Sequence, residues 1–351
     1  MRPVIGELKS SPVIKRYEGN PVLSAKDIPG PATLIFNAGV AKYQGRYVML
    51  YRNNVFKTPP PGAEHPDPHS STGLYLGLAY SKDGVSWEAS AKQLNVEKGI
   101  FEAAKEHFPY RDVSKELLFV YDPRITVVEG RCVICFALET PHGIHGGIAV
   151  TEDFEHFKVT CITTPDNRNM VVFPERVGGK YVRLERPMPV YSHGRDKFDI
   201  WLSSSQDLCI WGEHTLLLGV EEVPFSNNKL GPAAPPVRTS KGWLTTFHAV
   251  DFDPERGKNG WEKKWQKRYT AGIMLLDLND PRKIIGMSKE PLLAPELSYE
   301  VSGGLRNNVI FPGGMILEDS GEVKIYYGAA DTVECLATAN IDELIGLCLK
   351  N

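Results

Sequence analysis

The chain repeats one pattern of apolar and polar positions five times. Each copy begins at a turn glycine, continues through a run of β-branched, aromatic and aliphatic residues, and closes on a polar or charged residue. A similar run precedes each glycine, so each copy predicts two adjacent strands joined by a glycine turn. The copies recur at intervals of about 50 to 85 residues, which is typical of a radial repeat whose small sheets bury their faces against each other. The five segments are Gly45–Arg52, Gly130–Glu139, Gly179–Arg186, Gly242–His248 and Gly321–Asp331.

The repeat predicts an all-β, five-bladed β-propeller with loop and short helical insertions. The strands expected to lead into the glycine turns are Phe36–Val40, Tyr121–Thr126, Val171–Val177, Pro236–Thr239 and Asn308–Phe311. Four insertions depart from the pattern: a proline-rich stiff loop over Phe56–His69, helical periodicity over Glu97–Glu116, and loops over Pro141–Gly147 and Asp251–Gly260. The first two either rim a substrate site or decorate the surface.

A second motif, Ser/Thr-x-Asp-x3-aromatic, supports this count. It occurs at Ser81–Trp87, Thr151–Phe157 and Ser205–Trp211. An aspartate in this position can accept hydrogen bonds from backbone N–H groups of a turn, while the aromatic residue folds back onto the sheet. The motif is structural and implies no chemistry.

Length and charge narrow the alternatives. A chain of 351 residues ordinarily suggests two domains, but a propeller closes as one unit. We therefore expect one catalytic domain over residues 1–351, with about 20 N-terminal and about 15 C-terminal residues as closing or flanking segments. The net charge of −3 gives no basic field for nucleic acid. No apolar run could cross a membrane and the charged start Met1–Lys9 differs from a signal peptide, so a cytoplasmic location is expected.

The six cysteines fit that compartment, because most fall inside apolar β-runs. Cys132 and Cys135 have the spacing of a metal-binding pair, yet residues three apart in a strand point to opposite faces. We therefore expect no metal site and no cofactor.

The candidate chemistry lies where polar residues recur at one position of the repeat. Asp122 precedes a proline and an arginine at the start of a strand, and alone it would be interpreted as a turn residue. Arg52, Arg186, His248 and Asp331 lie at the ends of equivalent strands, and equivalent positions in different blades meet in space.

A cationic group adds to this expectation. If Arg168, Lys229, Arg186 and His248 converge, their charges would be costly to bury without an anion, and guanidinium groups match phosphate oxygens. For any one of these side chains, a surface salt bridge is the simpler account.

These residues together resemble glycoside hydrolase family 130, the β-mannoside phosphorylases and related mannosidases. The resemblance extends from about Asn20 to about Asn340. Its motifs are Asn37-Ala-Gly, Tyr51-Arg52, Tyr121-Asp-Pro-Arg124, Asn167-Arg168 to Phe173-Pro174, Arg186-Pro187, Lys229 to Pro236, His248, Tyr299-Glu300, Asn308-Val to Pro312 and Tyr327-Gly-Ala-Ala-Asp331. Members of this family are five-bladed propellers, in agreement with the repeat.

The resemblance also implies roles for single residues. It makes Asp122 the general acid, acting through the 3-hydroxyl of the mannose. It makes Arg168, Arg186, Lys229, His248 and Tyr269 the inorganic-phosphate site, and Asn37, Arg52, Glu300 and Asp331 the residues that hold the mannosyl unit. It implies no cofactor, with phosphate as a co-substrate.

The expected activity is therefore that of an inverting, glycosyltransferase-type phosphorylase. It would cleave a β-mannoside or manno-oligosaccharide with phosphate and release α-mannose 1-phosphate. An inverting hydrolase would need a second carboxylate to activate water. Glu175 and Glu185 lie near the cationic residues in sequence, but strand alternation places Glu185 on the face opposite Arg186.

Several alternatives stay open. The linkage is β-1,4 to glucose, N-acetylglucosamine or mannose, or it is β-1,2. An inverting β-mannosidase on the same fold, with water in place of phosphate, is the first rival. A non-catalytic glycan-binding propeller is the second rival, and it would not need Asp122. The sequence does not fix the oligomeric state, and a homo-oligomer is one alternative.

Overall fold

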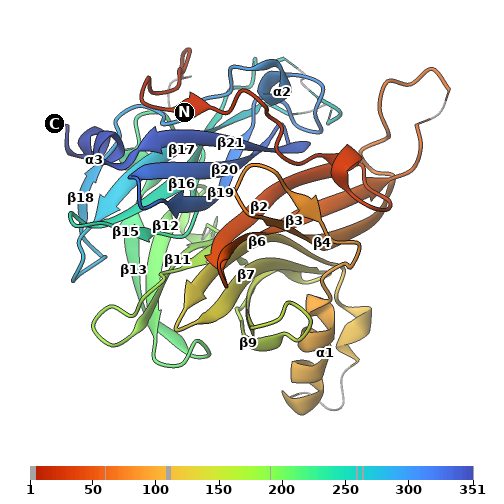
Figure 1. Ribbon diagram of the computed structural model, residues 1–351, viewed down its shortest axis with the longest axis horizontal. Helices are drawn as coiled ribbons and strands as arrows, with labels where there is room; N and C mark the ends of the chain where they lie inside the picture. Colours follow the sequence, from red (N-terminus) through yellow and green to blue (C-terminus); the bar gives the residue numbers. More distant parts are fainter. Residues whose placement is uncertain are drawn as a thin grey trace.

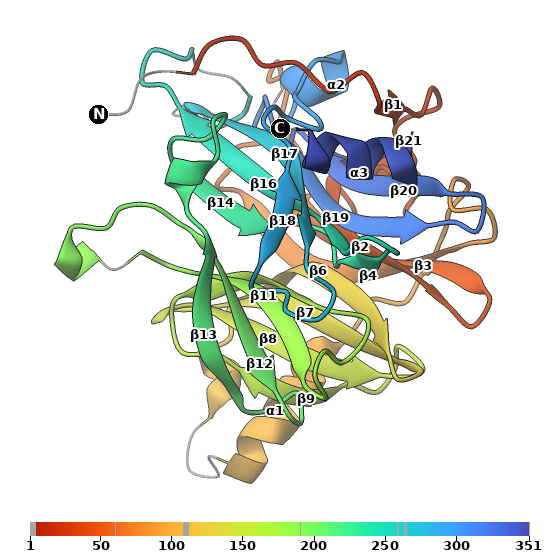
Figure 2. The same cartoon turned by 90° about the vertical axis from the view of Figure 1, so that its left-hand side faces the viewer.

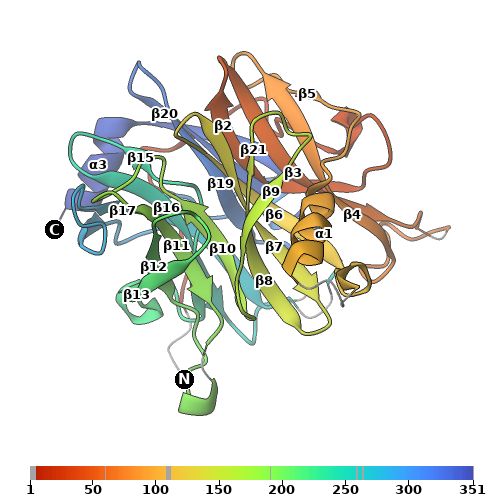
Figure 3. The same ribbon diagram turned by 90° about the horizontal axis from the view of Figure 1, so that it is seen from below.

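The computed structural model describes residues 5–59, 61–107, 112–189, 191–257, 260–262 and 265–350. Five small antiparallel sheets surround a common axis (Figures 1 and 3). The predicted five-bladed propeller is confirmed. Blade 1 contains β2 (Leu34–Tyr43), β3 (Arg46–Phe56), β4 (Ser71–Ser81) and β5 (Glu88–Ala89); blade 2 contains β6 (Phe119–Val128), β7 (Arg131–Thr140), β8 (Gly143–Thr151) and β9 (Lys158–Ile162).

Blades 3 to 5 complete the ring (Figure 2). Blade 3 contains β10 (Asn167–Val172), β11 (Tyr181–Pro187), β12 (Ile200–Ser205) and β13 (Trp211–Leu218). Blade 4 contains β14 (Lys229–Pro232), β15 (Val237–Arg238), β16 (Trp243–Phe252), β17 (Lys267–Leu276) and β18 (Ile284–Met287). Blade 5 contains β19 (Ile310–Leu317), β20 (Glu322–Ala329), β21 (Val333–Asn340) and the N-terminal strand β1 (Lys15–Arg16), which pairs with β21.

The innermost strands of blades 1, 2 and 3 share an irregularity that bears on the site. Their registers shift next to Asn37, Asp122 and Asn169, and these residues have φ angles of 55°, 52° and 57°. Asn308, just before β19, has a φ of 59°. Asparagine and aspartate tolerate this left-handed conformation better than other residues with side chains. The repeated bulge therefore turns a short polar side chain out of each strand at the same position.

The aspartate motif forms the predicted turn. Asp83 accepts hydrogen bonds from the backbone N–H groups of Val85 and Ser86, each at 2.8 Å, and Asp153 and Asp207 accept the equivalent pairs. A fourth turn of this kind occurs at Asp277, and the sequence pattern missed it because Leu275 replaces the Ser/Thr and Pro281 replaces the aromatic residue. The motif thus sets the turn into the outermost strand of four blades.

Two predicted boundaries were wrong. The segment Pro141–Gly147 is mostly strand, since β8 begins at Gly143. A Cβ atom on Gly147 would lie 2.1 Å from the Phe136 ring, so this glycine reflects close packing instead of a loop. The innermost strand of blade 4 is divided into β14 and β15, which both pair with β16, and β14 was not predicted because it ends in a proline-rich run.

The helices lie outside the blades. The helical periodicity is confirmed by α1 (Val96–His107), which contacts β9 of blade 2 (Figure 3), although Phe108 and Pro109 lie outside the described residues. The short helix α2 (Ser298–Val301) and the C-terminal helix α3 (Ile341–Leu349), which contacts β18, were not predicted. The loop after β3 is confirmed, since β4 begins at Ser71.

Three further observations concern the paired cysteines, metal binding and membrane spans. Cys132 and Cys135 lie in different hydrophobic clusters, which confirms that they face opposite sides of β7. Among the described residues, no group of three or more His, Cys, Asp or Glu side chains is placed to hold a metal ion. Within the same ranges, every helix is too short or too polar to span a lipid bilayer.

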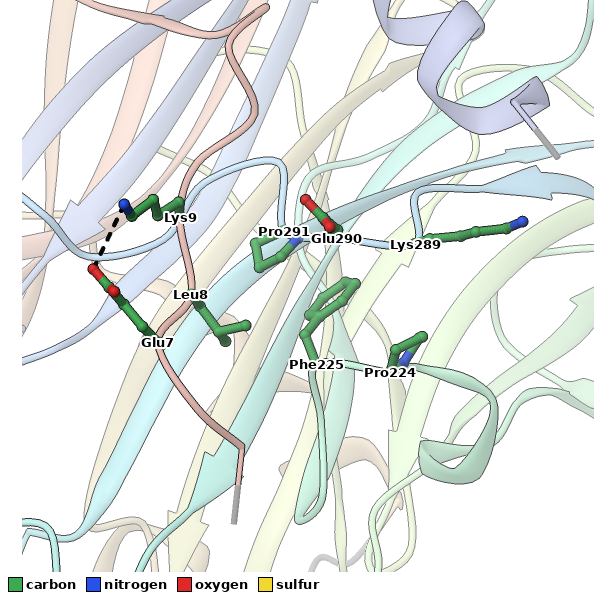
Figure 4. Close-up of a pocket in the computed structure, with 8 residues that line it drawn as sticks. All are labelled: Glu7, Leu8, Lys9, Pro224, Phe225, Lys289, Glu290 and Pro291. Carbon is green, nitrogen blue, oxygen red and sulfur yellow. Dashed lines mark ion pairs between the residues drawn. The ribbon is translucent and has the colours of Figure 1, made fainter. Parts of the chain in front are cut away.

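The N-terminal segment crosses the outside of blade 4. Leu8 lies opposite Phe225 and Pro291 around a shallow surface pocket, and Glu7 and Lys9 form an exposed ion pair at its edge (Figure 4). The pocket contains none of the predicted site residues. It is a seam between the N-terminal segment and the propeller.

Candidate active site

A small polar cavity of about 60 Å³ opens among the innermost strands of the propeller. Its lining comes from all five blades. The lining residues are Asn37, Arg52, Tyr121, Asp122, Arg168, Asn169, Arg186, Trp265, Tyr269, Arg306, Val309, Phe311 and Asp331. The repeat therefore brings together predicted residues that are up to about 300 positions apart in sequence.

Asp122 lies in the bulge of β6 and is held from the neighbouring blade. Its Oδ1 accepts a hydrogen bond from the Asn37 side-chain amide at 3.1 Å and one from the Arg52 guanidinium at 3.2 Å. Burial disfavours its charged form, but Arg52, Asn37 and nearby Arg124 outweigh that effect and hold the pKa of Asp122 below its usual value. Without a ligand, Asp122 is thus a carboxylate held in one orientation.

Arg52 is fixed on both faces of its guanidinium group. The group lies 4.8 Å from the ring centroid of Phe36 and 4.9 Å from that of Tyr121, and its Nε donates to Asn54 at 2.8 Å. These contacts explain how a flexible side chain keeps one position beside Asp122. The prediction that Arg52 and His248 lie at strand ends was wrong, because both lie inside their strands.

Arg186 is a buried cation with no carboxylate within ion-pair distance among the described residues. Its side chain is 2 % exposed, and its Nε and Nη2 atoms have no hydrogen-bond partner among the described residues. Its Nη1 lies 3.5 Å from Nε2 of His248. Burial and the neighbouring Arg168 lower the pKa of Arg186 to about 9. Guanidinium donors that are buried without partners indicate a place for an anion.

Two further cations lie beside Arg186. Arg168 donates to the Tyr121 hydroxyl at 3.5 Å, and its own Nε has no partner within the described part of the chain. Lys229 is buried next to the Tyr269 ring, with its Nζ 5.7 Å from the ring centroid. Burial, together with Arg186 and Arg168, lowers the pKa of Lys229 to about 7. Lys229 does not line the cavity itself and lies behind its wall.

Aromatic rings pack next to these cations. Trp265, Tyr269 and Phe311 line the cavity, whereas His248 lies behind them. His248 is fully buried, and its ring lies 4.7 Å from that of Phe311 and 6.0 Å from that of Tyr269. Tyr269 in turn stacks on Trp265 at 5.6 Å. Burial and the nearby cations Arg186 and Lys229 hold the pKa of His248 well below its usual value, so its imidazole is neutral.

Asp331 faces the cavity from blade 5 and is paired with a residue that sequence analysis missed. Arg306 contacts Asp331 at 3.3 Å and Glu262 at 2.5 Å, and its guanidinium lies 4.9 Å from the Trp265 ring. Burial raises the pKa of Asp331. Arg306 and Trp265 lie in loops between strands, where the repeat gives no register, so the pattern offered no signal for them.

Asn169 was also missed, although a signal for it exists. It occupies the same left-handed bulge position in β10 that Asn37 and Asp122 occupy in β2 and β6, and its Oδ1 is buried without a partner in the described structure. An alignment of the innermost strands on their Asn or Asp residue would have found it.

The other carboxylates near these residues lie outside the cavity. Glu300 is fully buried and accepts from Arg16 at 2.7 Å and from the Tyr327 hydroxyl at 2.9 Å. Glu185 is held by Arg183 at 2.8 Å, behind the strand face that carries Arg186. Glu175 lies at the surface, 3.7 Å from Arg238. The carboxylates that line the cavity within the described residues are Asp122 and Asp331.

Comparisons with known proteins agree with this arrangement. A family model described as beta-1,4-mannooligosaccharide phosphorylase matches residues 9–350. The chain is 30 % identical to a beta-1,4-mannooligosaccharide phosphorylase of Ruminococcus albus, over 95 % of this chain and 90 % of that protein. It is 28 % identical to a beta-1,2-mannobiose phosphorylase of Listeria innocua, over 95 % and 97 %.

A solved structure gives the same fold. The Listeria innocua beta-1,2-mannobiose phosphorylase, in complex with beta-1,2-mannobiose, superposes with a TM-score of 0.77 at 26 % identity, over 95 % of this chain and 99 % of that chain.

Proposed function

This chain belongs to glycoside hydrolase family 130, and from that premise we propose that it is an inverting phosphorylase that transfers a β-linked mannosyl unit to inorganic phosphate. The observation that carries the proposal is Arg186, a buried guanidinium whose Nε and Nη2 donors have no partner within the described residues. A phosphate ion would accept both hydrogen bonds and balance the charges of Arg186, Arg168 and Lys229. Phosphate enters as a co-substrate, and no cofactor takes part.

The cationic wall would hold the nucleophile. Arg168 and Arg186, which line the cavity, would bind the phosphate oxygens, with the Tyr269 hydroxyl as a further hydrogen-bonding group. Lys229 and the neutral His248 imidazole belong to the same phosphate site from behind this lining, Lys229 through its charge and His248 through its contact with Arg186. Phosphate is already charged and therefore needs positioning instead of deprotonation. One phosphate oxygen would attack the anomeric carbon from the face opposite the leaving group, so the product would be α-mannose 1-phosphate.

Asp122 would supply the proton. As the bond from the anomeric carbon to the leaving oxygen breaks, the proton of Asp122 would pass through the sugar 3-hydroxyl to that oxygen. The low pKa of Asp122 opposes this role, because the nearby arginines favour the carboxylate. Bound phosphate would offset those charges and raise the pKa of Asp122. Phosphate would thus prepare the general acid as well as provide the nucleophile.

The mannosyl unit would lie between blades 1, 2 and 5. Asn37, Arg52 and Asp331 line that part of the cavity and offer donors and acceptors for sugar hydroxyls. Glu300 would act indirectly, since its carboxylate is already bonded to Arg16 and Tyr327. We propose a β-1,4-mannoside as the first substrate to test, because the matched family model and the Ruminococcus albus relative both carry that linkage in their names.

The decisive experiment identifies the product. Purified protein is incubated with β-1,4- and β-1,2-mannosides with and without phosphate, and anomer-resolved NMR follows the products. We expect α-mannose 1-phosphate, formed only with phosphate, and synthesis of the β-mannoside in the reverse direction. Free α-mannose released at the same rate with and without phosphate would identify a hydrolase and point to Asp331, the other carboxylate found in the described lining, as its base.

A further inference from the structure

One buried side chain, Arg124 of β6, contacts the innermost segments of four blades. Its Nε donates to the Ala233 carbonyl at 2.7 Å and its Nη2 to the Pro312 carbonyl at 3.2 Å. Its Nη1 donates to the carbonyls of Asn37 at 3.3 Å and Pro123 at 2.8 Å. The side chain is only 2 % exposed, so the guanidinium lies at the centre of the ring, where blades 1, 2, 4 and 5 meet.

The backbones around Arg124 approach too closely to carry further side chains. A Cβ atom on Gly39 would lie 2.8 Å from the Cα of Arg124, and one on Gly313 would lie 2.0 Å from the Ala38 carbonyl oxygen. Such close approach leaves the strands little room to shift relative to one another. The guanidinium hydrogen bonds therefore act on backbone segments that are already packed in one arrangement.

Three of the four carbonyls belong to residues of the site or adjoin them. Asn37 donates its side-chain amide to Asp122, and Pro123 follows Asp122 directly. Pro312 follows Phe311, whose ring packs against His248 on the cationic wall. The backbone of the neighbouring Ala38 is held as well, because its N–H donates to the buried Glu334 carboxyl at 3.1 Å.

A purely apolar centre would not require this residue. Burying a guanidinium group costs free energy, and no carboxylate lies within ion-pair distance of Arg124 in the described structure. Its four carbonyl partners offset that cost only because they converge on one point. The four carbonyls require several hydrogen-bond donors in one plane, which a leucine or methionine of similar size cannot supply.

We propose that Arg124 is a positioning residue for the reaction: it fixes the bulge that carries Asp122 and the Asn37 amide relative to the wall that carries His248 and Phe311. This inference rests on the proposed role of Asp122 as the proton donor. It assigns Arg124 no contact with substrate. Loss of the guanidinium is expected to shift Asp122 by a fraction of a bond length to about 1 Å, which is enough to cost roughly 100-fold in rate.

The test compares two leaving groups in Arg124→Ala. A sugar leaving group needs a well-placed acid, whereas a nitrophenolate leaves without a proton. We expect the turnover number to fall about 100-fold on a β-mannosyl disaccharide but less than about tenfold on a nitrophenyl β-mannoside, with the Michaelis constant for phosphate changed little. Added guanidinium chloride, below denaturing concentrations, should restore part of the disaccharide activity by occupying the vacated volume.

Two variants make this test decisive. Arg124→Lys keeps the charge but has only one donor group, so it should show the same leaving-group dependence, and it is measured in case Arg124→Ala does not fold. Arg176→Ala removes an exposed arginine from the connection between β10 and β11. It should leave both rates unchanged, and added guanidinium should not affect them. Equal losses on both substrates, or no loss on either, would overturn the proposal.

The outcome is separable from that of the proposed function. If the wild type releases free mannose without phosphate, the phosphorylase proposal fails, but the leaving-group comparison still applies, because hydrolysis of a sugar glycoside needs the same proton. If the wild type is a phosphorylase and Arg124→Ala loses both substrates equally, the positioning role alone fails.

Discussion

On the side of the cavity formed by blades 1, 2 and 5, arginines and carboxylates occur as pairs. Arg52 contacts Asp122, Arg306 contacts Asp331, and Arg16 contacts Glu300 just outside the cavity. On the side formed by blades 3 and 4, Arg168, Arg186 and Lys229 contact no carboxylate within the described residues. On the first side each of these cations is balanced by a carboxylate of the protein, whereas the cations of the second side have no anionic partner in the described residues.

This difference separates two kinds of contribution to catalysis. The paired side is already organised, so its residues should affect the rate of the chemical step once substrate is bound. The unpaired side gains most of its stabilisation when an anion arrives, so its residues should affect binding of that anion and the stability of the folded protein in its presence. The predictions below test this division, beginning with the largest effect.

Asp122→Asn should have the largest effect. The asparagine keeps the size and the contacts with Asn37 and Arg52 but cannot donate a proton as an acid, so turnover should fall by about two to four orders of magnitude. The Michaelis constant for phosphate should change little, because the cationic wall is untouched. Near-normal turnover on a disaccharide with the fold intact would show that the proton donor lies elsewhere.

Arg186→Ala should act on binding instead. The variant removes two buried donors that have no partner among the described residues, and charge-assisted hydrogen bonds contribute about 1.5–3 kcal/mol each, so the Michaelis constant for phosphate should rise about 100-fold or more. The constant for the mannoside should rise much less. Phosphate should also raise the Tm of the wild type but not that of the variant. An equal rise in both Michaelis constants would contradict the division between the two sides.

The sequence predicted the parts of the site that the repeat itself places. Asn37, Arg52, Asp122, Arg168, Arg186 and Asp331 lie on or directly beside innermost strand pairs, where equivalent positions must converge, and they line the cavity. Arg306 and Trp265 escaped prediction because their loops follow no period. The axial role of Arg124 escaped for a different reason. Its partners are backbone carbonyls, and no residue type marks a carbonyl that will face the axis.

Glu300 was predicted as a site residue, but it does not line the cavity. The resemblance placed it among the residues that hold the mannosyl unit, but the structure places its carboxylate between Arg16, Tyr327 and the start of α2, outside the cavity lining. A residue of a family motif can therefore support the site without lining its cavity. The contact with Arg16, which is about 280 positions away in sequence, shows this for Glu300.

Lys229 gives a smaller effect that depends on pH. Its pKa is lowered to about 7 by burial and by Arg186 and Arg168, so at about pH 8 it is mostly neutral, and bound phosphate should raise its pKa and draw in a proton. Calorimetry in two buffers of different ionisation enthalpy should detect proton uptake at about pH 8 that shrinks at about pH 6, where Lys229 is already charged. Lys229→Met should lose the proton uptake that Lys229 causes. Any uptake that remains in this variant then comes from the protonation of phosphate itself.

Glu334 should give the smallest effect, and it concerns stability instead of binding. Burial raises the pKa of Glu334 from 4.5 to about 8, and one of its oxygens has no partner within the described structure. A raised pKa in the folded state means that its contribution to stability is complete below about pH 4.5 and is lost as the pH rises through about 8.

Glu334→Gln removes this pH dependence while keeping an acceptor for the Ala38 N–H. The difference in Tm between Glu334→Gln and the wild type should therefore become more favourable to the variant by about 2 °C or more from about pH 5 to about pH 8.5. Glu18→Gln, in an exposed turn, should show no such trend. A constant difference in Tm across this pH range would mean that Glu334 is ionised in the folded protein and that the positive charge of Arg124 compensates it. Arg124 and Glu334 would then be a further pair of opposite charges, at the axis of the propeller.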